Sequence, residues 1–102
     1  MDMKKMMKQA QKMQRDAAAA QEEIAAMTFE ASAGGGMVKA TATGDGAITA
    51  VVIDPAAVDP EDVEMLQDMV TAAVNEALRS ASEAASARMN AIMGGMKIPG
   101  LM

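Results

Sequence analysis

The sequence predicts an α+β fold, α-β-β-β-α in order, with a three-stranded antiparallel meander between two long helices. Apolar residues recur at helical spacing in two long segments near the two ends of the chain. Between these segments the pattern changes to alternation of period two, which is typical of half-buried strands. Glycine-rich stretches separate the short segments, as the turns of a meander require. With 102 residues, the chain is long enough for one domain, residues 1–102.

The first predicted helix spans residues 3–27. Its apolar side chains step alternately by three and four residues, which is the heptad spacing of a coiled-coil seam. We define the seam by these residues: Met3, Met6, Ala10, Met13, Ala17, Ala20, Ile24 and Met27. Four basic side chains fall within about 80° of one another on the opposite face of this helix: Lys4, Lys8, Lys12 and Arg15. This face is either an ordinary solvated surface or a site for a polyanion.

The three predicted strands span residues 28–33, 37–43 and 47–54. The run Gly34–Gly36 separates the first two strands, and Gly44-Asp45-Gly46 separates the last two, where a tight turn with a positive φ angle is expected. Three consecutive glycines also occur in phosphate-binding loops. The lysine and serine of such a loop are missing here and no helix follows, so a hairpin turn is the better interpretation.

The second predicted helix spans residues 60–93, with a tail at residues 94–102. Asp59 is placed to cap it and Pro60 suits its first turn. Its first half carries the apolar residues expected to cover the sheet: Val63, Leu66, Met69, Val70 and Val74. A helix of this length is about 50 Å long, whereas a compact chain of this size has a radius of gyration of about 13 Å. The second half, rich in alanine and serine, therefore either projects into solvent or packs shallowly against a helix of another chain.

The composition argues against an enzyme. The chain has no cysteine, histidine, tryptophan or tyrosine, so the usual nucleophiles, bases and metal ligands are missing. Its main carboxylate cluster lies at the start of the second helix, where capping explains it: Glu61, Asp62, Glu64 and Asp68. We therefore expect no cofactor, metal or small-molecule substrate. The sequence also lacks a signal peptide and a long apolar run, so we expect a cytoplasmic protein without a membrane partner.

Charge is unevenly distributed along the chain. The net charge is −5, but residues 1–15 carry five basic side chains and one acidic side chain, and the remaining residues carry four basic and thirteen acidic ones. Both predicted helices have their free ends on the side away from the sheet. Because residues 1–15 lie at such a free end, the pattern predicts a basic tip and an acidic body.

Several segments, in order and at matching spacing, resemble the YbaB/EbfC family of bacterial nucleoid-associated proteins. They include Met7-Lys8-Gln9-Ala10-Gln11, Gly36-Met37-Val38-Lys39-Ala40, Val52-Ile53-Asp54-Pro55, Asp59-Pro60-Glu61-Asp62 and Gly94-Gly95-Met96-Lys97-Ile98-Pro99-Gly100. The resemblance extends over essentially the whole chain. It implies a tweezer-like, intertwined homodimer that binds double-stranded DNA through helical prongs, with low sequence specificity, and that is located in the nucleoid.

The expected contacts fall into two groups. DNA phosphates are expected to contact the basic residues near the free helix ends, namely Lys4, Lys5, Lys8, Lys12, Arg15, Arg88 and Lys97. The dimer interface is expected to contain Met13, Ala17, Ala20, Ile24, Met27, Val70, Val74, Asn75 and Leu78. Asn75 either sets the register of that interface or is an ordinary surface residue.

A second function is compatible with the same pattern. The methionine-rich seam could belong to a coiled-coil adaptor or cochaperone that binds a protein partner, because methionine adapts to irregular apolar surfaces. Such an adaptor would bind its partner equally well without the lysine face. The contribution of that face to binding therefore separates the two functions.

Overall fold

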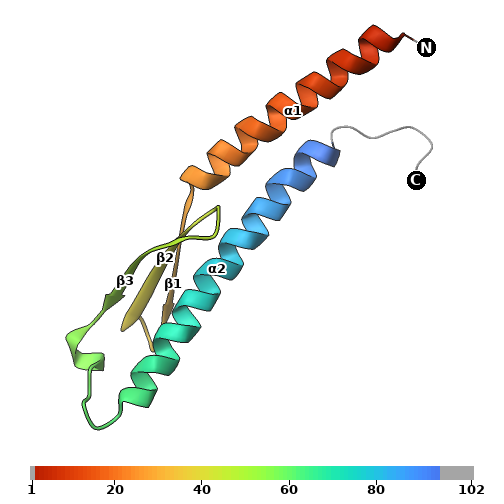
Figure 1. The fold of residues 1–102 in the computed structure, drawn as a ribbon. Helices are drawn as coiled ribbons and strands as arrows, with labels where there is room; N and C mark the ends of the chain where they lie inside the picture. The colour runs from red at the N-terminus through yellow and green to blue at the C-terminus, as the bar shows by residue number, and fades with distance from the viewer. Residues whose placement is uncertain (1, 95–102) are drawn as a thin grey trace.

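The computed structural model describes residues 2–94 and shows the predicted α-β-β-β-α order. The elements are α1 (Met3–Ala26), β1 (Thr28–Ala33), β2 (Val38–Thr43), β3 (Ile48–Ile53), the short 3-10 helix η1 (Pro55–Ala57) and α2 (Val63–Gly94). The molecule is elongated, at 71 × 26 × 16 Å, with a radius of gyration of 20.0 Å. Figure 1 shows that both helices extend past the sheet toward the same end. The expectation that the long helices do not fit within a compact monomer is confirmed.

The first helix begins and ends close to its predicted positions. The Asp2 carboxylate caps it by accepting a hydrogen bond from the backbone N–H of Lys4, at 3.1 Å. The helix ends at Ala26, one residue before the predicted end. Met27 is extended, with φ −75° and ψ 145°, so the chain passes directly into β1. Met27 therefore leaves the helical seam at the point where the sheet begins.

The sheet is an antiparallel meander in the order β1-β2-β3. Gly34, Gly35 and Gly36 all have positive φ angles, which gives the β1–β2 hairpin a turn that other residues would adopt only under strain. Gly46 has φ +91° in the β2–β3 turn, as expected for that glycine-rich segment. The second and third strands each begin one residue later than predicted, and β3 ends one residue earlier.

The start of the second helix differs from the prediction. We expected it at Pro60 with Asp59 as the cap, but α2 begins at Val63. The Asp59 carboxylate accepts from the N–H of Glu61 at 2.9 Å and its carbonyl from the N–H of Asp62 at 2.9 Å, which closes a separate turn. Asp62 then caps the helix by accepting from the N–H of Met65 at 3.2 Å. The predicted cap was wrong because two aspartates three residues apart can both cap, and the turn uses the first. The helix continues through Gly94, and residues 95–102 of the predicted tail lie outside the described residues.

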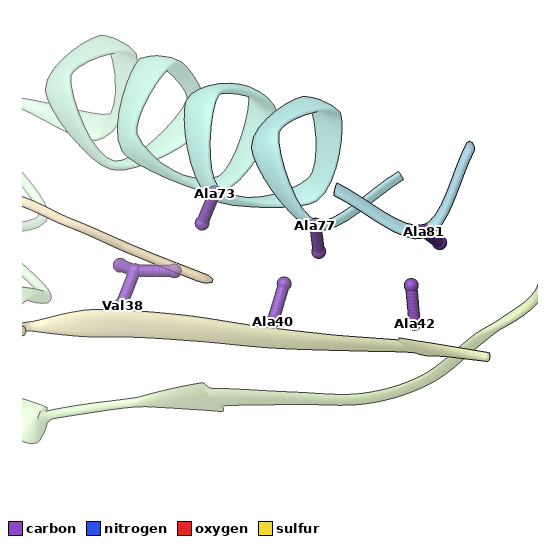
Figure 2. Packing of buried hydrophobic residues seen from close by; sticks show 6 residues of the cluster. All are labelled: Val38, Ala40, Ala42, Ala73, Ala77 and Ala81. Carbon is purple, nitrogen blue, oxygen red and sulfur yellow. The ribbon is translucent and has the colours of Figure 1, made fainter. Parts of the chain in front are cut away.

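The core is formed by small side chains of β2 and α2 that face one another (Figure 2). The fully buried residues of this cluster are Val38, Ala40, Ala42, Ala73, Ala77 and Ala81. The predicted covering residues Leu66, Met69, Val70 and Val74 are partly buried around it, whereas Val63 is exposed. Because alanine adds only a methyl group, the helix lies close to the central strand. Ala77 and Ala81, in the alanine-rich part of α2, therefore pack against the sheet of their own chain.

The end of α1 is held against the sheet by a close backbone contact. The N–H of Gly44 donates to the carbonyl of Met27 at 3.1 Å. A Cβ atom at Gly44 would lie 1.9 Å from the carbonyl oxygen of Ile24, so only glycine fits there. Ile24 and Ala20 are buried in the same region, where α1 packs against α2. This contact sets the direction in which the rest of α1 leaves the sheet.

We predict that Gly46→Val lowers the free energy of unfolding by about 1–3 kcal/mol, because valine at φ +91° is strained. Open space surrounds the Cβ position, so crowding does not contribute. Urea unfolding measures the change. Gly46→Asn is the control and should recover part of the loss, since asparagine tolerates positive φ better than valine. Equal stability of the valine variant and wild type would contradict the turn.

We predict that Ala77→Leu destabilises the fold by about 1–3 kcal/mol, because the larger side chain pushes α2 away from β2. Ala72→Leu on the exposed face of the same helix is the matched control, and leucine and alanine are both good helix formers. Thermal unfolding of both variants is the measurement. Similar melting temperatures for the two would show that the alanine contact is not close.

Candidate nucleic-acid interface

The N-terminal half of α1 carries a basic stripe on its exposed surface. We define the basic stripe as Lys4, Lys5, Lys8, Lys12 and Arg15, which all lie within about 100° of one another around the helix axis. All five side chains are exposed, and within residues 2–94 none of them forms an ion pair. Figure 1 shows this half of α1 extending beyond the sheet. The stripe is therefore a row of solvated cations on a projecting rod.

The opposite side of the same segment is apolar. Met3, Met6 and Met7 are 73%, 55% and 60% exposed, and with Ala10 they line a shallow hollow. Further along the seam Met13 and Ala17 are half-buried, and Ala20 and Ile24 are buried. Burial of the seam therefore increases from Met3 at the tip to Ile24 near the sheet, whereas Met27, which lies beyond the helix, is exposed. The tip exposes an apolar surface that nothing in the described chain covers.

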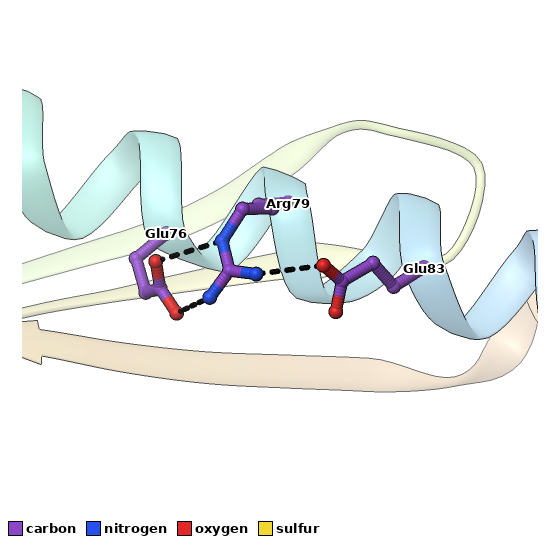
Figure 3. A network of polar contacts seen from close by, with 3 residues as sticks. All are labelled: Glu76, Arg79 and Glu83. Carbon is purple, nitrogen blue, oxygen red and sulfur yellow. Dashed lines mark hydrogen bonds and ion pairs between the residues drawn. The ribbon is translucent and has the colours of Figure 1, made fainter.

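The two described arginines of α2 are both held by carboxylates. Arg88 donates to Glu23 of α1 at 2.9 Å. Arg79 lies between Glu76 and Glu83 of its own helix (Figure 3), with its Nη1 2.6 Å from Glu83 Oε1. The hydrogen bond from Arg79 lowers the pKa of the Glu76 carboxyl below its usual value, which keeps this partner ionised. Arg79 is therefore neutralised locally. Of the two DNA contacts expected in the C-terminal part of the chain, Arg88 lies on α2 and Lys97 lies outside the described residues.

Acidic side chains gather at the other end of the molecule. They lie along η1, the following turn and the first turns of α2: Asp54, Asp59, Glu61, Asp62, Glu64 and Asp68. Figure 1 shows this region at the end opposite the start of α1. Three of these carboxylates accept backbone hydrogen bonds near them, namely Asp54, Asp59 and Asp62. The long axis of the molecule thus runs from a basic tip to an acidic end.

The residues expected in a dimer interface are not equally accessible in one chain. Ala20 and Ile24 are already buried between α1 and its neighbours, and Val70, Val74 and Leu78 are half-buried over the core. Met27 and Asn75 are exposed, and Asn75 makes no side-chain hydrogen bond within residues 2–94. The exposed or half-buried members are thus Met13, Ala17, Met27, Val70, Val74, Asn75 and Leu78.

Residues 2–94 contain neither a metal-binding cluster nor a membrane-spanning helix. No group of three or more histidine, cysteine, aspartate or glutamate side chains there is arranged to hold a metal ion. In the same range, no helix is both long enough and apolar enough to cross a membrane.

The contact that sequence reasoning missed is the one between Glu23 and Arg88. These residues are 65 positions apart, so no local spacing could indicate it.

Comparison with known proteins identifies relatives along most of the chain. The model of the YbaB/EbfC DNA-binding family matches residues 1–96. A nucleoid-associated protein of Pelotomaculum thermopropionicum is 55% identical over 100 residues, covering 98% of this chain and 95% of that protein. A nucleoid-associated protein of Moorella thermoacetica is 57% identical over 99 residues, covering 97% and 95% of the two chains.

A solved structure has the same fold. The crystal structure of the uncharacterized protein HP0035 from Helicobacter pylori superposes with a TM-score of 0.75, over 95% of this chain and 99% of that chain. The two sequences are only 23% identical. The α-β-β-β-α arrangement is therefore shared by two chains of low sequence identity.

Proposed function

The chain belongs to the YbaB/EbfC DNA-binding family, and from this premise we propose that it is a nucleoid-associated protein that binds duplex DNA as a homodimer. The observation that carries the proposal is the basic stripe of α1. Five exposed cations without ion pairs within residues 2–94 lie on one face of a projecting helix. Such a row is suited to the regularly spaced negative charges of a nucleic-acid backbone.

The proposed mechanism is phosphate contact with little reading of base sequence. Lysine and arginine side chains that approach phosphates release condensed counterions, and this release supplies most of the binding free energy in non-specific complexes. Phosphate contacts position a protein on the duplex but carry no sequence information directly. The side chains of the stripe are almost all lysines, which act as point charges rather than as bidentate readers of bases. Low sequence specificity follows.

The charge distribution favours contact through the tip. The basic stripe lies at one end of a 71 Å molecule, and the acidic cluster around the start of α2 lies at the other. Duplex DNA is repelled by the acidic end and attracted by the basic end. We therefore propose that DNA meets the helical prongs end-on and does not wrap around the sheet.

The homodimer is supported by the apolar surface that one chain leaves exposed. The fully buried residues of the core are mostly alanines, and Val38 is the largest fully buried side chain within residues 2–94. Large apolar side chains remain exposed on α1 and on the edge strand β3, where Val52 is 62% exposed. A surface of this kind is typical of a protein that associates. A second copy packed against the seam would leave the basic stripe, on the opposite face of α1, free for DNA.

The exposed methionines of α1 also support a second candidate function, a coiled-coil adaptor that binds a different protein. Methionine side chains adapt to partners of varied shape. In this case the basic stripe would be a solvated face without a role in binding. The two functions therefore differ in what removal of the stripe does.

We predict that changing Lys4, Lys8 and Lys12 to glutamine weakens binding to unrelated duplex sequences by a similar factor. It should also flatten the slope of log affinity against log salt by about 0.9 for each phosphate that the variant no longer neutralises. Glutamine preserves helix propensity, so α1 should remain folded. Fluorescence anisotropy at several salt concentrations is the measurement. Lys39→Gln on the exposed face of β2 is the control and should change little. If the triple variant binds as tightly as wild type at every salt concentration, the adaptor becomes the better proposal.

We predict that light scattering gives twice the 10.5 kDa chain mass at micromolar concentration. Met13→Asp should raise the dissociation constant of the dimer by about tenfold or more, because it places a charge in the proposed apolar seam. Gln11→Asp adds the same charge on an exposed face of α1, outside the seam, and should leave the dimer intact. A folded wild-type monomer at this concentration would contradict the homodimer.

A further inference from the structure

An ion pair joins α1 and α2 on the sheet side of the basic stripe, eight residues beyond Arg15, the last member of the stripe. Arg88 of α2 lies 2.9 Å from Glu23 of α1, and this is the one ion pair between helices within residues 2–94. Both side chains are at least half exposed. The pair is therefore accessible to an ion from solution.

Glu23 lies on the same side of α1 as part of the basic stripe. It follows Lys5 by 18 residues, which is about five full turns of an α-helix, and it follows Lys12 by 11 residues, about three turns. Looking down the helix axis, the three side chains nearly coincide. Glu23 thus places the guanidinium of Arg88 beside the row formed by Lys5 and Lys12, although Arg88 belongs to α2.

An exposed ion pair of this kind is weak and easily exchanged. Pairs on protein surfaces contribute little net stability, and salt weakens them further. A phosphate group offers arginine the same charge and a geometry suited to bidentate hydrogen bonds. A DNA phosphate that reaches this ion pair can therefore replace the Glu23 carboxylate.

We propose that Glu23 holds Arg88 beside the basic stripe in the free protein through their ion pair, and that a DNA phosphate replaces Glu23 as the partner of Arg88 on binding. The proposal rests on the proposed DNA-binding function and adds a DNA contact from α2. Glu23 thereby opposes DNA binding twice, as a negative charge near the duplex and as a competitor for Arg88. The first effect is shared by any neighbouring carboxylate, whereas the second belongs to Glu23 alone.

Glu22 provides the matched control. It precedes Glu23 on α1, is exposed, carries the same charge and forms no ion pair within residues 2–94. Changing either glutamate to glutamine alters the net charge equally. A difference in DNA affinity between the two variants therefore measures the competition for Arg88 and not the general electrostatic effect.

The test is a titration of one random-sequence duplex with wild type, Glu23→Gln, Glu22→Gln, and each glutamine variant combined with Arg88→Gln. Glu23→Gln should bind roughly 1.5- to 5-fold more tightly than Glu22→Gln at low salt, as expected when an exposed ion pair no longer has to be broken. The difference should shrink as salt is added. It should vanish when Arg88 is also replaced. Circular dichroism verifies that the variants keep their helices.

The outcomes separate this proposal from the one on which it rests. Equal affinities of Glu23→Gln and Glu22→Gln, with salt-dependent binding of wild type, would overturn the proposed exchange of partners at Arg88 and leave the proposal of DNA binding intact. A difference that persists after Arg88→Gln would also overturn it, because the effect would not pass through Arg88. A wild-type protein that does not bind the duplex would remove both proposals.

Discussion

The close contact between α2 and the central strand β2 is the interaction on which the rest of the structure depends. Three alanines of α2 face Val38, Ala40 and Ala42 of β2, so the helix approaches the sheet with only methyl groups between them over much of the contact. Small side chains bury little area each, so the half-buried side chains around them, such as Leu66, Met69 and Val70, complete the contact. The buried alanines lie between residues 73 and 81 of α2. The elongated shape of the molecule comes from the parts of α1 and α2 that continue past the sheet.

The direction of the prongs follows from the same arrangement. Because α2 crosses the sheet and continues past it, its second half runs beside α1, whose C-terminal end is held at Gly44 by the close approach of Ile24. The basic stripe is thereby carried away from the acidic turn that precedes α2. Charges that would attract one another in a compact chain are kept at opposite ends. This separation is what allows an acidic protein to present a local basic surface.

Much of the fold is readable from local patterns, and the errors occurred where two local interpretations compete. Alternation and glycine turns place the strands to within a residue, because the period of two and the positive φ angles depend on near neighbours. The start of α2 was misplaced because Asp59 and Asp62 are both good caps, and the helix uses the second. The basic stripe was likewise readable, since its members lie on one helix at regular spacing. The ion pair between Glu23 and Arg88 was not, because it joins residues distant in sequence.

The sequence by itself determined the order of the elements, the turns, the two faces of α1 and the segregation of charge along the chain. These properties depend on covalent geometry and on spacing within single helices and strands. Only the tertiary structure decided that Arg88 is held by a carboxylate of α1, whereas the partners of Arg79 lie three and four residues away on its own helix. It also decided that Gly44 needs to be glycine, since the neighbour it would touch is the backbone of another element. Such contacts arise when elements pack, and packing depends on shape in three dimensions, which no spacing along the chain records.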